Sequence, residues 1–156
     1  MAKERSITPA EVWQNVIHER FLCRLCRSPF SKNFILKGGV LLAKYVDIGR
    51  ETKDLDFSTR NIPSDFSQLT EIIHRISAID LNDGFGFSEI KVEPLEHFHM
   101  EYSGARIKMQ GCLGKARLPL FIDQKYWESY RPITIFPNRL PAHINVVINS
   151  INTWIN

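Results

Sequence analysis

The sequence lacks the features that mark membrane-spanning and secreted proteins. No window holds about 18 consecutive apolar residues, the length that a membrane-spanning helix needs. No N-terminal apolar segment resembles a signal peptide. The chain has only 3 cysteines, an odd number, so a disulfide framework is not expected. The net charge of +3 is too small by itself to indicate a nucleic-acid partner. We therefore expect a cytoplasmic protein without membrane association.

What remains is the composition of an ordinary globular domain. The chain has 156 residues, 44% of them hydrophobic and 24% charged, which suits one domain with its own core. Internal repeats and low-complexity stretches are absent. We expect residues 1–136 to form this domain. Residues 137–156 are expected to be an irregular tail, as in a truncated chain, although a strand at 144–151 is an equal alternative.

The order of secondary-structure signals predicts the fold class. Thr8, Pro9 and Glu11 form the pattern of a helix cap, and apolar residues then recur at helical spacing over 9–27. The predicted strands are 34–36, 53–59, 88–94, 98–110 and 116–123. Pro119 makes the last of these an edge or bulged strand at that point. Two further helices are expected, over 40–47 and from Pro63 onward, and their buried sides should include Leu41, Leu42, Tyr45 and Phe66. Together these elements predict an α+β domain, a mixed sheet with helices packed on it.

The most informative segment runs from Lys37 to Phe57. Gly38 and Gly39 open a helix, where exposed backbone N–H groups suit a phosphate. Asp54 and Asp56 follow at i and i+2 on a strand, so both carboxylates share one face and can hold a divalent cation. A helix over 40–48 is about 13 Å long. The segment 49–53 can reach back at most about 17 Å. The two halves can therefore meet in one metal–nucleotide site.

Further residues can complete that site. Asp123 ends an alternating strand, and a third carboxylate there would allow a second metal ion and activate an acceptor hydroxyl. Two carboxylates and substrate phosphates are the usual ligands of protein-bound Mg²⁺. Lys37, Arg50 and Lys53 lie near these elements in the sequence and could neutralise a triphosphate.

These segments resemble a known family. Phe34–Leu42 and Arg50–Phe57 look like the AbiEii/AbiGii toxin family of nucleotidyltransferases, which is related to the DNA-polymerase-beta-like superfamily. The similarity continues softly through Tyr102–Arg106 and Leu120–Asp123, and covers roughly residues 8–136. It implies a nucleotidyltransferase-like fold and the toxin of a bacterial toxin–antitoxin or abortive-infection system. Such an enzyme moves an NMP group from an NTP to an RNA, in some members the 3′ end of tRNA, or to a protein.

The resemblance also implies roles for single residues. Gly38 and Gly39 would cradle the phosphates, with Lys37, Arg50 and Lys53 as further nucleotide-binding residues. Asp54 and Asp56 would bind Mg²⁺, with two ions expected, and Asp123 would be the third ligand or the base. An NTP, an RNA acceptor and a cognate antitoxin are the expected partners. The chain departs from the family at Val40, where a Ser or Thr is common. Members are also commonly longer, with a helical C-terminal half that carries further site residues, a lysine among them.

Simpler interpretations stay open beside these. The glycine pair is also what a strand-to-helix turn needs, and the two aspartates could be a solvated strand end with Arg50 and Lys53 as surface partners. Cys23 and Cys26 have a redox or half-zinc spacing but lie in a helical pattern, which favours a structural role. Two function classes therefore remain, a catalytic nucleotidyltransferase and a non-catalytic nucleotide-binding module that acts through a protein partner.

Two other clusters are weaker candidates for function. His97, His99 and Glu101 alternate, so a strand would place them on one face as a metal set, although any half-solvated strand shows this pattern. A modest basic cluster could meet an RNA acceptor, with a charged helix face as the commoner explanation; it comprises Arg24, Arg27 and Lys32.

Overall fold

The computed structural model describes residues 8–43, 52–62, 65–95 and 104–126, and the structural statements below concern these. The elements follow one another as α1 (Pro9–Arg27), β1 (Phe34–Lys37), α2 (Gly38–Leu42), β2 (Asp54–Thr59), α3 (Phe66–Ser77), β3 (Phe85–Pro94), β4 (Gly104–Leu113) and β5 (Ala116–Tyr126). The predicted tail at 137–156, Arg50, and the alternating set at 97–101 lie outside the described residues.

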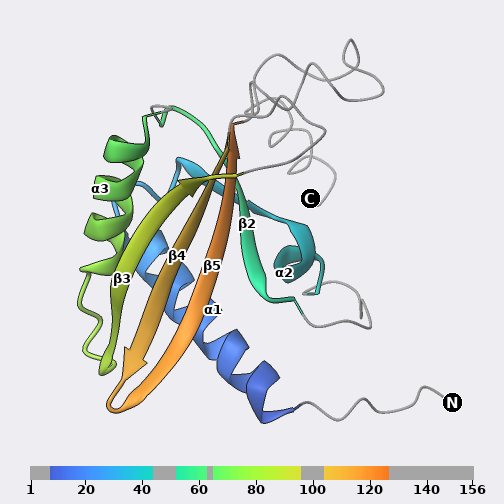
Figure 1. Ribbon diagram of the computed structural model, residues 1–156, viewed down its shortest axis with the longest axis vertical. Coiled ribbons are helices and arrows are strands. Elements are labelled where there is room, and N and C mark those ends of the chain that lie inside the picture. Colours follow the sequence, from blue (N-terminus) through green and yellow to red (C-terminus); the bar gives the residue numbers. More distant parts are fainter. Residues whose placement is uncertain (1–7, 44–51, 63–64, 96–103, 127–156) are drawn as a thin grey trace, which may run out of the picture.

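The strands form one mixed sheet in the order β1-β2-β5-β4-β3. β1 pairs with β2, β4 with β5 and β3 with β4 in antiparallel fashion, whereas β2 and β5 are parallel. The last three strands are the expected meander, and β5 returns to the middle of the sheet beside β2. Figure 1 shows the strands side by side, with α1 running diagonally behind them, α3 beside β3 and α2 next to β2. The predicted α+β fold with a mixed sheet is confirmed.

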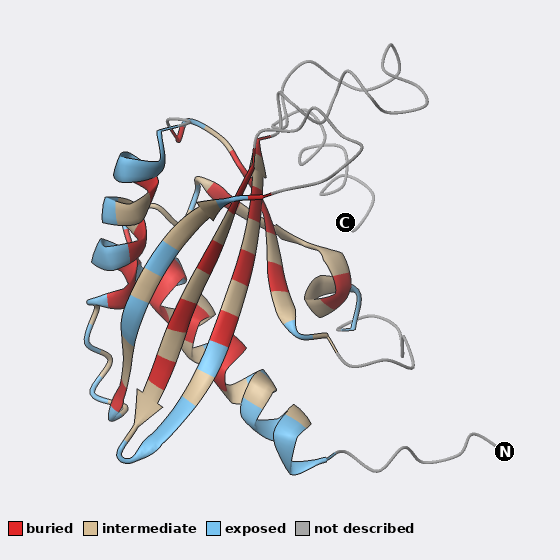
Figure 2. Cartoon of the chain, in the orientation of Figure 1, coloured by how far each residue is buried: buried red, intermediate tan, exposed pale blue. Residues whose placement is uncertain are grey.

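The core lies between one face of the sheet and the helices α1 and α3. Alternate residues of each strand enter it, and Figure 2 shows this alternation along β4 and β5. Leu55 and Ile122 are fully buried on paired positions of β2 and β5. The helical part of the same cluster comprises Ile17, Phe21 and Leu25 from α1, and Leu69, Ile73 and Ile76 from α3.

The helix ends follow the local sequence signals. Thr8 accepts a hydrogen bond from the backbone of Glu11, whose side chain accepts one from the Thr8 backbone, so the predicted capping box is present. At the start of α3, the Asp65 carboxylate accepts from the backbone N–H groups of Ser67 and Gln68. Both caps satisfy backbone donors that have no partner within the helix.

Three local predictions need correction or refinement. Leu42 was expected to be buried but is 54% exposed, because the described helix starts two residues earlier and turns Gly39 and Val40 inward instead. Phe66 is 38% exposed because it is the first residue of α3. Pro119 lies in a strand that becomes central, but the pairing with β2 starts only at Phe121. At Pro119 the strand is therefore an edge, as proline requires.

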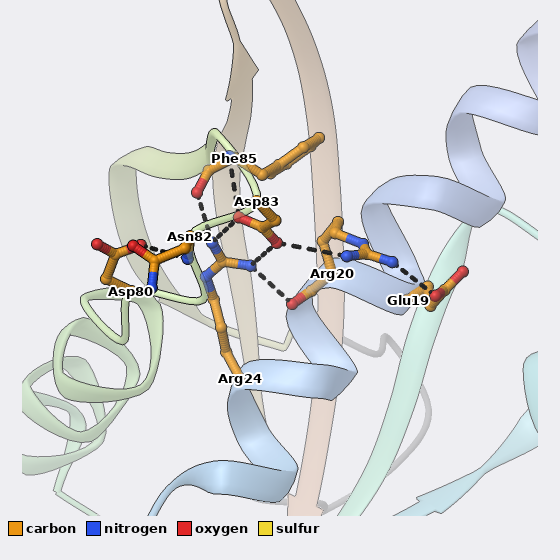
Figure 3. A network of polar contacts seen from close by, with 7 residues as sticks. All are labelled: Glu19, Arg20, Arg24, Asp80, Asn82, Asp83 and Phe85. Atoms are coloured by element: carbon orange, nitrogen blue, oxygen red, sulfur yellow. Dashed lines mark hydrogen bonds and ion pairs between the residues drawn. The ribbon is translucent and has the colours of Figure 1, made fainter.

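An ion pair between the buried Arg24 and the half-buried Asp83 holds the loop before β3 to α1 (Figure 3). Arg24 is 1% exposed and donates to both carboxylate oxygens of Asp83, at 3.1 and 2.9 Å. It also donates to the carbonyl oxygens of Arg20 and Phe85. These hydrogen bonds from Arg24 hold the pKa of Asp83 at about 2. Arg24 is therefore neither an RNA contact nor part of a solvated helix face, because its guanidinium is buried and hydrogen-bonded inside the fold.

Removing the acidic partner of this pair should strongly destabilise the protein. Asp83→Asn leaves the buried guanidinium of Arg24 without a counter-charge, and we expect the free energy of unfolding to fall by about 3 kcal/mol. Glu19→Gln is the matched control, because Glu19 is 62% exposed in its pair with Arg20 and should cost less than about 0.5 kcal/mol. Urea unfolding followed by circular dichroism measures both. Equal losses in the two variants would contradict the structural role of Asp83.

Candidate functional site

The two central parallel strands bring two predicted site residues together. Asp56 of β2 is the register partner of Asp123 of β5. Because Leu55 and Ile122, one residue earlier on each strand, enter the core, both aspartates face the opposite side of the sheet. Asp54 lies two residues before Asp56 and shares this face. The three predicted carboxylates therefore occupy adjacent positions on one face of the sheet.

The pairings extend this arrangement into a row of charged residues across all five strands. Lys37 is paired with Asp56, Asp123 with Arg106, and Arg106 with Glu93. In strand order the row has two cations, Lys37 and Arg106, on either side of the aspartate pair. The strand order and the side-chain alternation together produce this row, although these residues are far apart in the sequence.

The glycine turn lies against the same aspartates. Gly38 has a φ of +71°, a left-handed conformation that favours glycine. A Cβ at Gly38 would lie 2.2 Å from Asp56 Oδ2, and a Cβ at Gly39 would lie 2.6 Å from Thr52 Oγ1. Both glycines are therefore required for the close approach of the β2 strand. The Thr52 hydroxyl is buried there and has no hydrogen-bond partner in the described part of the chain.

The electrostatics of the row reflect burial and like charges. Burial raises the pKa of Asp56, and the Asp123 carboxylate raises it further, while Lys37 acts in the opposite direction. Burial also lowers the pKa of Lys37, assisted by Lys125, against the attraction of the two aspartates. Asp56 is thus a carboxyl group whose negative charge the fold compensates only in part. An added cation beside it would favour its ionised form.

Arg106 occupies the other side of Asp123. Its Nε and Nη2 atoms donate to the two carboxylate oxygens of Asp123, each at 2.8 Å. This hydrogen-bonded carboxylate raises the pKa of the guanidinium. The sequence placed Arg106 in a segment that resembles the family but gave it no role. Its partner could not be found without the register of β4 on β5.

A second group that the sequence did not reveal holds the start of β2. Gln14 Nε2 on α1 donates to the carbonyl oxygen of Lys53 at 3.1 Å, and His18 Nε2 lies 3.2 Å from the same oxygen. The two side chains also lie 2.9 Å apart. Burial of His18 lowers its pKa, with the Lys53 contact opposing. Together they fix the backbone immediately before Asp54. The spacing of Gln14 and His18, four residues apart on one helix face, was the available signal.

The residues present fit a divalent cation held by two carboxylates. Asp54 and Asp56 share a face beside the glycine turn, and Mg²⁺ commonly takes one or two carboxylates together with substrate phosphates. Among the residues that the structure describes, no group of three or more His, Cys, Asp or Glu side chains is arranged to hold a metal ion. The third carboxylate, that of Asp123, directs both of its oxygens to the Arg106 guanidinium.

The remaining candidates have diverse surroundings. Lys53 has an exposed side chain next to Asp54, and its role in nucleotide binding stays a prediction. Cys23 and Cys26 are free thiols on α1, the first half-buried and the second exposed, and their structural role stays a prediction. Within the described ranges no helix is long and apolar enough to cross a membrane.

A mixed sheet that presents paired aspartates beside a glycine turn is the arrangement expected of a nucleotidyltransferase. Residues 20–138 match the sequence model of the family described as "Nucleotidyl transferase AbiEii toxin, Type IV TA system", and the chain belongs to this family. The resemblance found in the sequence is thereby confirmed. No curated protein sequence matches the chain.

Two solved structures from Helicobacter pylori are similar to the chain. One is a proposed nucleotidyltransferase, with 17% sequence identity and a TM-score of 0.48, covering 79% of this chain and 48% of its own. The other is JHP933, with 18% identity and a TM-score of 0.48, covering 78% of this chain and 46% of its own. The chain therefore spans about half the length of these two proteins.

Replacing Gly38 tests the tight contact with Asp56. Gly38→Ala adds a Cβ that meets Asp56, including its Cβ atom at 3.0 Å, and also strains a positive φ. Gly114→Ala is the matched control, because Gly114 also has a positive φ (+55°) but nothing within 4 Å of an added Cβ. The strain of about 1–2 kcal/mol is common to both variants. We expect Gly38→Ala to lose at least about 1 kcal/mol more unfolding free energy; equal losses in urea unfolding would refute the contact.

The buried His18 predicts a pH dependence of stability. Its pKa in the folded protein lies below the ordinary value of 6.5. As the pH falls below about 6.5, the unfolded chain binds a proton at His18 before the folded protein does, so stability decreases until the folded pKa is passed. Stability curves between pH 7.5 and 5 should show a smaller decrease for His18→Gln than for the unchanged protein. His74→Gln, at an exposed histidine of α3, should leave the decrease unchanged.

Proposed function

We propose that the protein is a Mg²⁺-dependent nucleotidyltransferase that moves an NMP group from an NTP to a hydroxyl of an RNA acceptor, as the toxin of a type IV toxin–antitoxin pair. Membership of the AbiEii family supports the transferase class and the antitoxin as a partner. The observation that carries the proposal is the position of Asp54 and Asp56 on one sheet face, against the Gly38 turn. The nucleotide, the metal and the RNA are parts of the proposal.

The chain's own residues can be assigned to steps of this reaction. Asp54 and Asp56 would hold the metal ion, which supplies positive charge for the phosphates and the leaving group when bound. The backbone N–H groups at the start of α2, at Gly38 and Gly39, would donate to a phosphate. Lys37, Lys53 and Arg50 would add positive charge around the triphosphate.

Most of the catalytic effect in such a site comes from position and charge. The β2 strand is held at its start by Gln14 and His18, and along its length by β1 and β5. This fixes both carboxylates on a rigid element, and reacting groups that are held in place lose little entropy on the way to the transition state. Asp56 is already close to the carboxylate of Asp123, so a cation is favoured there.

The alternative is a binding module that keeps the fold and a nucleotide site and acts through a protein partner. A protein hydroxyl in place of RNA as the acceptor is a second alternative within the transferase class.

Transfer of label distinguishes these functions. The protein is incubated with each labelled NTP, Mg²⁺ and total bacterial RNA, and the RNA and protein fractions are analysed separately. We expect labelled RNA, decreased at least about 100-fold by Asp54→Ala/Asp56→Ala because the metal loses its ligands. Glu71→Ala removes an exposed carboxylate from α3 and should retain transfer.

The other results have definite meanings. Label in the protein fraction alone would identify a protein acceptor. Absence of transfer, with nucleotide binding intact in calorimetry, would favour the binding module. Transfer that survives in the double variant would reject Asp54 and Asp56 as metal ligands.

A further inference from the structure

The three aspartates of the site are not equivalent. Asp123 receives two hydrogen bonds from one guanidinium, at 2.8 Å each, so both of its oxygens already face a full positive charge. Of the three, Asp123 alone forms an ion pair within the part of the chain that the structure describes. Asp56 instead has the like-charged Asp123 as its register partner. The site thus has one carboxylate that is paired and two whose charges are left for a cation.

The pairing of Arg106 with Asp123 is selective. Glu93 is the register partner of Arg106 on the other neighbouring strand and lies on the same face. Glu93 nevertheless forms its ion pair with Lys108, at 2.6 Å. The guanidinium is directed to β5 and its aspartate, away from the nearer edge of the sheet. Lys108 neutralises Glu93, the carboxylate that would otherwise compete with Asp123 for Arg106.

A role in holding β4 to β5 does not by itself explain the Arg106–Asp123 ion pair. The two strands are in continuous register from Gly104 with Lys125 to Leu113 with Ala116. The Arg106 side chain is 39% exposed, and a partly exposed ion pair adds at most about 1 kcal/mol to such a ladder. The bidentate geometry instead fixes the orientation of one carboxylate in the site, which a lysine could not do equally well.

We propose that Arg106 takes the place of a second metal ion, so that the site binds one divalent cation, held by Asp54 and Asp56, while Asp123 stays paired with Arg106. A second ion with Asp123 as ligand would have to displace a bidentate, charge-assisted contact and then lie beside the released guanidinium. The inference rests on the proposed function for its relation to nucleotide transfer. The number of bound ions, however, is measurable without nucleotide. Arg106 is in these terms a positioning residue, because it acts through Asp123.

The test counts bound Mn²⁺ on the full chain. Electron paramagnetic resonance measures free Mn²⁺ during titration, in the absence of nucleotide. We expect one bound ion per chain in the unchanged protein and none in Asp54→Asn/Asp56→Asn. Arg106→Gln releases Asp123 and should bind a second ion. Arg106→Gln/Asp123→Asn removes both charges of the pair and should return to one ion, with a dissociation constant within about 3-fold of the original.

The control and the contrary results are defined by the same titration. Arg117→Gln removes an exposed cation from β5 whose hydrogen bonds go to the backbone carbonyls of Gly114 and Ala116, and should leave one ion bound. Two ions in the unchanged protein would overturn the inference and leave the proposed function intact. Loss of the ion, or a weakening of about 10-fold or more, in the double variant would overturn it by showing that Asp123 is a ligand.

Two further results also decide the matter. No bound ion in any variant would overturn both the inference and the metal dependence of the proposed function. The transfer assay tests the proposed function independently of this titration. If Arg106→Gln does not fold, as judged by circular dichroism, the Arg106→Gln/Asp123→Asn variant still shows whether Asp123 is a metal ligand.

Discussion

The parallel pairing of β2 with β5 is the constraint from which the site follows. It places Asp56 directly opposite Asp123, and like charges on neighbouring strands oppose the pairing that brings them together. The rest of this face contains compensation for that repulsion. Arg106 donates two hydrogen bonds to Asp123, Lys37 is the register partner of Asp56 on the other side and attracts it electrostatically, and Gly38 allows the turn to approach the Asp56 carboxylate. The charge that this compensation leaves on Asp54 and Asp56 is what the proposed cation would neutralise.

The stability of the fold is supplied by the other face of the sheet. There α1 and α3 bury a continuous apolar cluster, and the Arg24–Asp83 pair fixes the loop between α3 and β3. Gln14 and His18 of α1 connect this core to the other face, because they hold the carbonyl oxygen of Lys53 just before Asp54. The core therefore fixes the position of the strand that carries Asp54 and Asp56. This division lets polar residues accumulate on one face of a small domain.

The sequence predicted what is local and missed what depends on the strand order. The Thr8 and Glu11 cap, the strand with Asp54 and Asp56 on one face, and the mixed sheet were all predictable, because periodicity and caps are properties of neighbouring residues. The partner of Asp123 was not, since Arg106 reaches it only in the register of β4 on β5. The burial of Arg24 was also not predictable, because a helical arginine in a charged stretch gives no sign that it will form an ion pair with Asp83. The expected part of Arg50 is untested, as that residue lies outside the described ranges.

Charge balance on the row limits what the described residues can do for a nucleotide. With the Glu93–Lys108 pair balancing itself, the formal charges of Asp54, Asp56 and Asp123 against those of Lys37 and Arg106 leave a net −1. One divalent ion makes this +1, which is less than the charge of a triphosphate. Further positive charge for the phosphates must then come from outside this row. Lys53 is exposed beside it. If the proposed site holds one metal ion, nucleotide affinity rather than metal binding is therefore the property that depends most on residues outside this row, Lys53 among them.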